Sequence, residues 1–344
     1  MSITLTDLRK SFSGKPAVNG IDIDIAPGEF FAIVGASGCG KSTLLRLIAG
    51  LEVADAGEIA LGGKQVSGPG LHLPSEARGV GFVFQSYALW PHLDVRGNVA
   101  FPLEAAGLRA VEAARRAERH LTTVALEHYA SRKPAELSGG QRQRVALARC
   151  LAQDAGIILM DEPLANLDPH LRATMEEELV AFHRAAAATT VYITHDQREA
   201  MAVADRMAVM AAGRFLQVGA PDEVYARPAS AEVARFIGEG VVHPVTVTDG
   251  VVSLAGQPVP VQGEGGADGP RLALFRPKDL VVTAHGEGGA LTGRVTAVLY
   301  RGGYWEAKLA VDGLTEPFLL HLPRRAQVGD ELALCVSDGW LLPE

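Results

Sequence analysis

Short apolar runs alternate with longer helical patterns over about the first 235 residues of the chain. The expected strands are Glu29–Val34, Gly81–Phe84, Ile157–Met160, Thr190–Thr194 and Arg206–Met210, and the expected helices are Val111–Val124, Ser138–Ala152 and Pro169–Ala188. Nearly continuous apolar strands separated by helices are typical of a parallel sheet covered on both faces. The pattern therefore predicts an α/β fold for this region.

The pattern changes after Gly238–Gly240, where long helical stretches stop. Short strand-like runs broken by Gly, Pro and Asp follow, at Val242–Val247, Arg271–Phe275, Gly293–Tyr300, Glu306–Val311 and Glu331–Val336, and residues 263–270 have the composition of a loop. We therefore expect two domains, residues 1–238 and residues 239–344, the second a small all-β barrel.

Composition and charge restrict the function. The 344 residues are 48% hydrophobic and 21% charged, as in globular proteins, and the net charge of −8 disfavours a general nucleic-acid binder. The three cysteines, Cys39, Cys150 and Cys335, have no spacing typical of a disulfide framework or a zinc site. Without an apolar run of about 18–20 residues or a signal-peptide pattern, we expect a cytoplasmic chain that reaches a membrane only through a partner.

A phosphate-binding motif follows the apolar strand Glu29–Val34. The run Gly35-Ala36-Ser37-Gly38-Cys39-Gly40-Lys41-Ser42-Thr43 matches G-x-x-x-x-G-K-[ST] and precedes a helical pattern. Glycines let the backbone N–H groups approach a polyanion at a helix N-terminus. We expect these nine residues to bind ATP, Lys41 to reach the β- and γ-phosphates, and the Ser42 hydroxyl to be a ligand of Mg²⁺. Cys39 is read as a residue that fits the loop without a chemical role.

Carboxylates, an amide and an imidazole follow three other expected strands. Asp161 and Glu162 end the buried run from Ile157, Gln85 follows Phe84, and His195 follows Thr194. Ligands bind at the carboxyl ends of strands in open α/β sheets. We expect Asp161 and Gln85 to hold Mg²⁺ or its water, Glu162 to be the general base, and His195 and Gln85 to act at the γ-phosphate.

A second element suited to an anion lies at Leu137-Ser138-Gly139-Gly140-Gln141, where Ser138 can cap the following helix. Composition alone leaves open an ordinary capped helix. If the two phosphate-binding elements cannot meet within one copy, they must meet between two copies arranged head to tail, which would enclose two ATP molecules.

These motifs, in this order and spacing, resemble those of the ABC-transporter ATPase family over about residues 3–237. The resemblance implies a dimer in which Ser138, Gly139, Gly140 and Gln141 contact the ATP of the other copy. It implies that Leu167-Asp168 links the two sites, with Asp168 also near the ATP of the other copy, that Phe12 stacks on adenine, and that residues of about 86–155 form a helical subdomain.

Two further stretches resemble importers within this family. The segment Gln85–Leu93 is similar to the region that docks a permease, although Tyr87, Leu89 and Trp90 also suit the core of the helical lobe. Phe275–Leu280 and Gly293–Gly303 resemble the OB-like (TOBE) domain of maltose, iron and polyamine importer ATPases. The resemblance implies a permease partner at the inner face of the membrane, indirectly a solute-binding protein, and a small solute, with residues 84–103 closest to ferric-iron importers.

Two other functions remain as alternatives. A soluble ABC ATPase acting on nucleic acid or the ribosome would have the same nucleotide residues, but it predicts a basic surface, a coiled-coil insertion or two cassettes, and none is visible in the sequence. A purely regulatory ATP-binding module would lack the metal ligand or the base, whereas Asp161 and Glu162 are both present.

Overall fold

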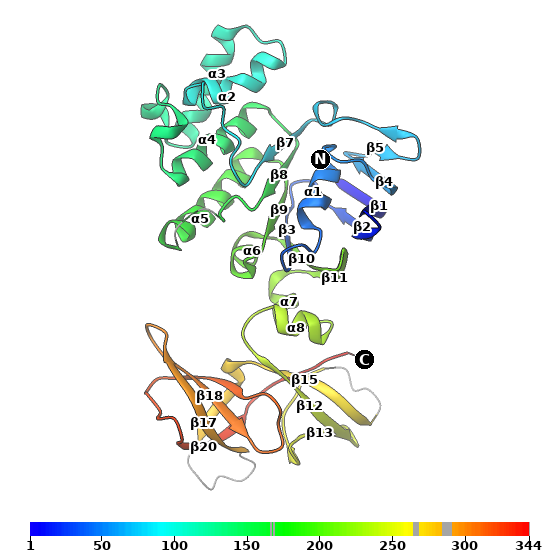
Figure 1. Ribbon diagram of the computed structural model, residues 1–344, viewed down its shortest axis with the longest axis vertical. Coiled ribbons are helices and arrows are strands. Elements are labelled where there is room, and N and C mark those ends of the chain that lie inside the picture. Colours follow the sequence, from blue (N-terminus) through cyan, green and yellow to red (C-terminus); the bar gives the residue numbers. More distant parts are fainter. Residues whose placement is uncertain (166, 168, 264–267, 284–290, 344) are drawn as a thin grey trace. The chain divides into compact units, whose positions relative to one another are not determined.

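A computed structural model describes residues 1–165, 167, 169–263, 268–283 and 291–343. The chain forms two compact units, Met1–Pro221 and Asp222–Glu344 (Figure 1). The boundary at residues 238 and 239 that the sequence suggests falls between the last helix and the following strand. Each unit is described by itself below.

An antiparallel sheet of five strands, in the order β2-β1-β4-β5-β6, opens the first unit. Its strands are β1 (Ile3–Phe12), β2 (Lys15–Ile25), β4 (Ala56–Leu61), β5 (Lys64–Gly68) and β6 (Leu71–His72). Ile3, Leu5 and Leu8 are all buried. A register shift between Leu5 and Leu8 adds a residue to β1, which keeps Leu8 on the buried face.

The second sheet has six strands in the order β11-β10-β3-β9-β8-β7. These are β3 (Phe30–Val34), β7 (Val80–Val83), β8 (Ile157–Asp161), β9 (Thr189–Thr194), β10 (Arg206–Ala211) and β11 (Arg214–Gly219). Neighbours from β10 to β7 are parallel, and only β11 is antiparallel. Every residue of β3, β8 and β9 is buried, which explains the continuous apolar run of β3 and the apolar runs that precede Asp161 in β8 and Thr194 in β9.

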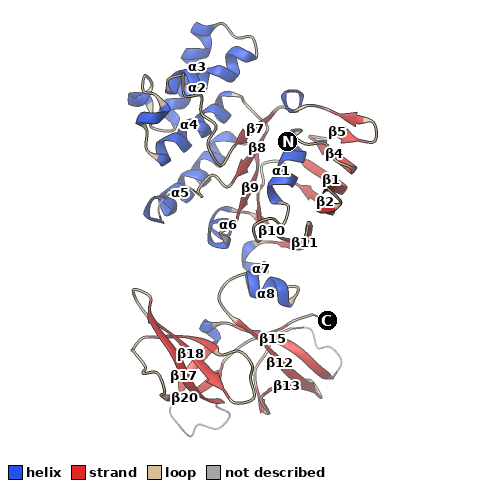
Figure 2. Ribbon diagram, in the orientation of Figure 1, coloured by secondary structure: helices blue, strands red, loops and turns tan. Residues whose placement is uncertain are grey.

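Helix α1 (Lys41–Ala49) packs against β8 and β9. Its residues Leu44, Leu45, Leu47 and Ile48 share one hydrophobic core with side chains of both sheets. Gly50 ends the helix in the left-handed conformation, with φ of 78°. Figure 2 shows the other helices of this unit. They are α2 (Val95–Ala105), α3 (Ala110–Thr123), α4 (Gly139–Ala152), α5 (Pro169–Ala186) and α6 (Gln197–Val203).

The helical subdomain consists of α2, α3 and α4, which pack on one another around an apolar core that includes Val99, Leu121 and Val145. Asp94 begins α2, because its carboxylate accepts a hydrogen bond from the Gly97 N–H at 2.7 Å. Helix α5 packs against α4 and α6, and α6 covers β3 and β9. Helix α1 and the pair of α6 and α5 therefore cover the six-stranded sheet.

The second unit contains two five-stranded antiparallel sheets, in the orders β14-β13-β12-β15-β21 and β16-β20-β17-β18-β19. Its elements are α7 (Pro221–Ala226), which starts at the boundary, α8 (Ala231–Phe236), β12 (Val241–Thr248), β13 (Val251–Leu254), β14 (Gln257–Pro258), β15 (Gly269–Phe275), β16 (Leu280–Thr283), β17 (Leu291–Tyr300), β18 (Trp305–Val311), β19 (Phe318–Leu322), β20 (Glu331–Val336) and β21 (Trp340–Leu341). Both sheets contribute to one core that includes Val245, Phe275 and Phe318, which gives a barrel-like fold.

Arg276 joins the helices of the second unit to its strands. Its guanidinium is buried and donates to the backbone carbonyls of Tyr225, Ile237 and Glu239 at 2.6, 3.0 and 3.0 Å. It also lies 3.7 Å from the ring centroid of Tyr225. These contacts explain why the segment before β12 belongs to this unit.

The α/β class of the first unit and the all-β barrel after it are confirmed. The strands and helices named from the sequence are present, and their ends agree within two residues. The antiparallel sheet β2-β1-β4-β5-β6 and helices α2, α6, α7 and α8 were not identified from the sequence. Within the described residues, no helix combines the length and apolarity that membrane crossing requires.

Candidate functional site

The ends of four parallel strands bring the predicted site residues to one edge of the sheet. Val34 pairs with Thr194, Ile193 pairs with Asp161, and Met160 pairs with Val83. The loops that leave β3, β7, β8 and β9 therefore start side by side. This alignment brings together the glycine-rich loop, Gln85, the Asp161–Glu162 pair and His195.

The loop between β3 and α1 has the tight backbone that its glycines predict. A Cβ at Gly40 would overlap the carbonyl oxygen of Ala17, and Gly40 has φ of 112°. A Cβ at Gly35 would overlap the carbonyl oxygen of Met210. Only glycine fits at these two places, and the resulting turn points the first N–H groups of α1 outward from the helix end.

Lys41 is buried within this loop. Its ammonium donates to the carbonyls of Gly35 and Ala36 at 2.7 and 3.2 Å and lies 3.9 Å from the Cys39 sulfur. A cation held beside a cluster of backbone N–H groups gives a site that fits a polyanion such as a triphosphate. Ala36, Ser37, Gly38 and Thr43 complete the same turn, and Ser37 and Gly38 are exposed.

Ser42 and Asp161 meet beneath the loop. The Ser42 hydroxyl donates to Oδ1 of Asp161 at 3.0 Å. Asp161 is 8% exposed, and this burial raises the pKa of its carboxyl group, with the Ser42 hydrogen bond acting in the opposite direction. A hydroxyl and a carboxylate are the hard oxygen donors that Mg²⁺ prefers, so these two residues fit that ion. Among the described residues, no group of three or more His, Cys, Asp or Glu side chains has the arrangement of a metal site.

Glu162 lies between the two other predicted site residues. Its Oε2 is 3.4 Å from Nε2 of Gln85, which donates to it, and 3.3 Å from Nδ1 of His195. Glu162 has φ of 44°, a left-handed conformation that is unusual away from glycine, and its N–H donates to the carbonyl of Ile193. This backbone turn directs the Glu162 side chain away from β8 and toward the neighbouring strand ends. Backbone strain of this kind is typical of functional sites.

The second expected phosphate element is a capped helix start. Ser138 Oγ accepts from the Gln141 N–H at 3.3 Å, and Gln141 Oε1 accepts from the Ser138 N–H at 2.9 Å. This capping box begins α4, and Gly139 and Gly140 form its first turn. No hydrogen bond among the described residues joins this element to the loop Gly35–Thr43.

Phe12 and the segment after Gln85 carry the remaining aromatic predictions. Phe12 is 47% exposed, with the Lys10 ammonium 5.2 Å from its ring centroid. Tyr87 is buried, whereas Trp90 is exposed and lies 5.4 Å from the exposed ring of Phe101. The segment after Gln85 therefore contributes one aromatic side chain to the core and one to the surface, which agrees in part with each of the two interpretations given above. Asp168 lies outside the described residues.

Two side chains near this edge were missed by the sequence analysis. Arg149 of α4 donates to backbone carbonyls of the segment after Gln85. Glu199 of α6 accepts hydrogen bonds from Tyr192 and Thr194 just before His195. For Arg149, the signal in the sequence was a charged residue within the apolar part of a predicted helix. Glu199 lies three residues after Asp196, a spacing that reads as a capping box and so conceals its actual partners.

The chain matches known families and proteins over most of its length. Residues 18–165 match the family described as ABC transporter, and residues 273–342 match the TOBE domain. The chain is 44% identical to an sn-glycerol-3-phosphate import ATP-binding protein of Paracoccus denitrificans, over 95% of this chain and 91% of that protein. It is 41% identical to an Fe(3+) ions import ATP-binding protein of Rhizobium etli, over 90% and 88% of the two chains.

Solved structures similar to the chain include two cassettes. One is the dimeric post-hydrolysis state of the ATP-binding cassette MJ0796 bound to ADP and Pi, with a TM-score of 0.57, 31% identity, and coverage of 64% of this chain and 98% of that one. The other is CbiO1 from Clostridium perfringens, part of an ABC transporter complex, with a TM-score of 0.59, 30% identity and coverage of 68% and 92%.

Proposed function

This chain belongs to the ATP-binding subunits of importer-type ABC transporters, and from that premise we propose that two copies of it hydrolyse MgATP at their interface to drive uptake of a small solute through a partner permease. One observation carries the proposal. Glu162 is held between Gln85 and His195 at the same sheet edge as the phosphate-binding loop. A base, an amide and an imidazole beside a polyanion site are the groups that phosphoryl transfer to water requires.

The phosphate-binding loop supplies attraction and position. Backbone N–H groups of Gly38 and of residues 40–43 would face the phosphates, whereas the Cys39 N–H donates to the carbonyl of Ala36, and Lys41 would exchange its carbonyl partners for the β- and γ-phosphate oxygens. Ser42 and Asp161 would hold Mg²⁺, which when bound would neutralise phosphate charge. Glu162 orients the attacking water and accepts its proton, while Gln85 and His195 donate to the γ-phosphate region as charge develops.

The interface between two copies completes each site in this proposal. In the capping box, Ser138 Oγ accepts a hydrogen bond and therefore keeps its own hydroxyl proton to donate. A hydroxyl proton and the first N–H groups of α4 form a donor surface suited to the γ-phosphate of a facing copy. Gly139, Gly140, Gln141 and Asp168 belong to the same proposed contact, and Phe12 offers an exposed ring face to adenine. The similar cassette MJ0796 is dimeric with ADP and Pi.

The permease would bind the exposed aromatic surface formed by Trp90 and Phe101 in the helical subdomain. This contact would place the chain at the inner face of the cell membrane, with a solute-binding protein acting indirectly through the permease. The solute is proposed to be small. Residues 84–103 favour ferric iron, while similar relatives are named for sn-glycerol-3-phosphate, Fe(3+) ions and spermidine/putrescine import.

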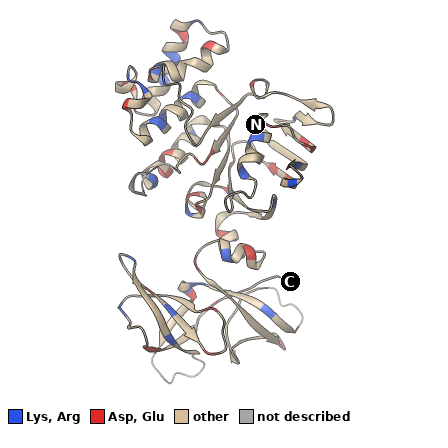
Figure 3. Cartoon of the chain, in the orientation of Figure 1, with Lys and Arg blue, Asp and Glu red and all other residues tan. Residues whose placement is uncertain are grey.

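The alternative, action on nucleic acid or the ribosome, is not supported. The net charge is −8, and blue and red residues are interspersed along the helices and strands in Figure 3 rather than separated into a basic face. The relatives named above are import proteins.

The test is ATP hydrolysis by the purified chain and its Glu162→Gln variant. We expect the variant to bind ATP with unchanged affinity but to lose turnover by at least about a hundredfold, because the amide cannot accept the proton from water. Light scattering with MgATP should then show a long-lived dimer for the variant. Glu177→Gln, an exposed carboxylate on α5, is the control and should behave as the parent. Turnover of Glu162→Gln equal to that of the parent would remove Glu162 from the proposed mechanism.

A further inference from the structure

A buried carboxylate with no part in the proposed chemistry lies directly behind the His195 loop. Glu199 of α6 is 4% exposed. Its Oε2 accepts hydrogen bonds from the Tyr192 hydroxyl at 2.7 Å and the Thr194 hydroxyl at 2.6 Å. Both donors belong to the last residues of β9, immediately before His195. The carboxylate therefore binds the end of the strand that presents the imidazole.

Thr194 continues this contact into the loop itself. Its Oγ1 donates to Glu199 and also accepts from the N–H of Asp196 at 3.0 Å. The two residues that flank His195 are thus bonded to each other through Thr194 Oγ1, and this hydroxyl is in turn bonded to Glu199. With the positions of residues 194 and 196 fixed, the direction in which His195 leaves the backbone is also fixed.

Arg172 connects the same carboxylate to a second predicted functional segment. From α5, its Nε lies 3.3 Å from Glu199 Oε1, and its Nη1 donates to Asp196 Oδ2 at 3.3 Å. Its Nη2 donates to the carbonyl oxygen of Leu167 at 3.5 Å. Leu167 precedes Asp168, the residue expected to act across the dimer. One guanidinium therefore contacts both the His195 loop and the segment of Leu167.

A buried charge is costly unless its surroundings compensate it. One guanidinium and two hydroxyls compensate the charge of Glu199. An apolar residue of similar size could fill the same volume and would need no such partners. Two carboxylates, those of Asp196 and Glu199, share the single guanidinium of Arg172. An arrangement of this kind is sensitive to small displacements of either segment.

We propose that Glu199, through Thr194 and Arg172, is a positioning residue that holds the His195 side chain in place beside Glu162 and couples the His195 loop to Leu167. The inference rests on the proposed role of His195 at the γ-phosphate. In this arrangement Glu199 touches neither nucleotide nor water. It acts on turnover by fixing where the imidazole stands, and a displacement of about 1 Å is sufficient to slow an enzyme by one to two orders of magnitude.

The experiment uses Glu199→Gln in the 344-residue chain. The parent's own turnover tests the proposed function, and the ratio of variant to parent tests this inference. We expect kcat to fall by about tenfold while the KM and the Kd for ATP stay within about twofold, because the phosphate-binding loop is untouched. Glu177→Gln on α5 is the matched control with an exposed carboxylate.

A double-mutant cycle separates positioning from general destabilisation. In a His195→Ala background, Glu199→Gln should cause no further loss of turnover, since the group that it positions is gone. Thr194→Val removes the hydroxyl and keeps the shape, so it should lower kcat, whereas Thr194→Ser should recover most of that loss. This pair also keeps the proposal testable if Glu199→Gln folds poorly.

A readout without nucleotide completes the test. Amide hydrogen exchange of the peptide that contains Asp196 should become at least about tenfold faster in Glu199→Gln and in Thr194→Val, because the Asp196 N–H loses a fixed acceptor. Parent-like exchange together with parent-like kcat would overturn the inference. Equal fractional losses of kcat in the His195 and His195→Ala backgrounds would also overturn it, because they would show that Glu199 does not act through His195.

Discussion

The guanidinium of Arg149 donates to the backbone carbonyl of Tyr87, with 2.8 Å between Nη2 and oxygen. Its Nη1 donates to the carbonyl of Ala88 at 2.7 Å. Tyr87 and Ala88 have φ of 63° and 45°, a left-handed conformation that costs non-glycine residues about 1–2 kcal/mol each. Arg149 therefore holds a strained turn between Gln85 and the exposed Trp90, from the same helix that Ser138 begins.

Replacing Arg149 with Met should release this turn. We expect a loss of about 2–3 kcal/mol of stability, because two hydrogen bonds from a charged donor disappear, and a fall in ATP turnover with little change in ATP affinity. Denaturant unfolding and steady-state kinetics measure the two effects. Arg119→Met, at an exposed position on α3, should change neither quantity. Parent-like turnover in a destabilised Arg149→Met protein would limit Arg149 to a structural role.

Lys41→Ala should abolish most of the affinity for MgATP. The ammonium is the buried cation of the phosphate-binding loop, and charge-assisted hydrogen bonds of this type contribute about 1.5–3 kcal/mol each, or roughly a 10- to 100-fold change in Kd. Binding of a fluorescent ATP analogue measures the change. Lys64→Ala, at an exposed position of β5, is the charge-matched control, and equal affinities of both variants would contradict the loop assignment.

Phe12 tests recognition of the base. Its ring is 47% exposed, which leaves a face for adenine. We expect Phe12→Ala to weaken ATP binding by about 1–3 kcal/mol, the usual contribution of a base stacked on an aromatic ring. Phe12→Tyr, which keeps the ring, should bind as the parent does. If tripolyphosphate binding falls as much as ATP binding in Phe12→Ala, the ring does not act through the base.

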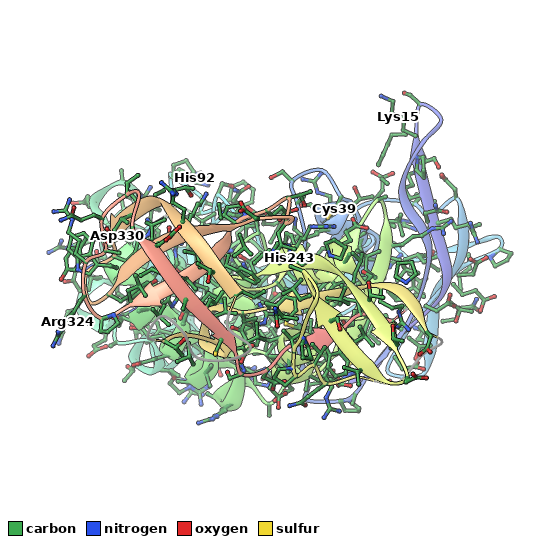
Figure 4. The ribbon with its side chains drawn as sticks, turned by 90° about the horizontal axis from the view of Figure 1, so that it is seen from below. Lys15, Cys39, His92, His243, Arg324 and Asp330 are labelled. Atoms are coloured by element: carbon green, nitrogen blue, oxygen red, sulfur yellow. The ribbon has the colours of Figure 1, made fainter. Side chains whose placement is uncertain are left out.

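His243 gives the second unit an acid-sensitive core. Its side chain is fully buried between Phe275 and Phe318, among the strands in Figure 4, and neither ring nitrogen has a hydrogen-bond partner among the described residues. Burial lowers the pKa of His243 from its ordinary 6.5 to about 4, with Glu316 acting weakly in the opposite direction. The unfolded chain therefore takes up this proton before the folded one does.

The sign of the pH dependence follows from this order of protonation. The stability contributed by neutral His243 is complete above pH 6.5 and is lost as the pH falls from about 6.5 toward about 4. Compared with His243→Leu, the parent should lose on the order of 1 kcal/mol between pH 7 and pH 5. Urea unfolding of both proteins at the two pH values measures the difference. Identical pH slopes would show that His243 is already protonated or solvated in the folded protein.

Local sequence was sufficient for the elements whose patterns depend on short-range rules. The buried runs of β3, β8 and β9 are unbroken because both faces of a central parallel strand are covered. Gly35 and Gly40 are required by the tight turn of the phosphate-binding loop, so the motif predicts both the turn and the helix after it. The edge at which Asp161, Glu162 and His195 gather followed from parallel pairing alone.

The antiparallel sheet of the first unit could not be found in this way. Its strands are half-exposed, and the bulge in β1 interrupts the alternation on which recognition depends. The partners of Arg149 and Glu199 were hidden for a different reason. Arg149 reaches carbonyls about 60 residues away along the chain, and Glu199 turns from a plausible cap toward Thr194. Sequence determined which strands end in chemically useful residues, because that depends on neighbours along the chain. Only the tertiary structure decided which side chains hold those residues in place, because buried charges find their partners across the packed elements.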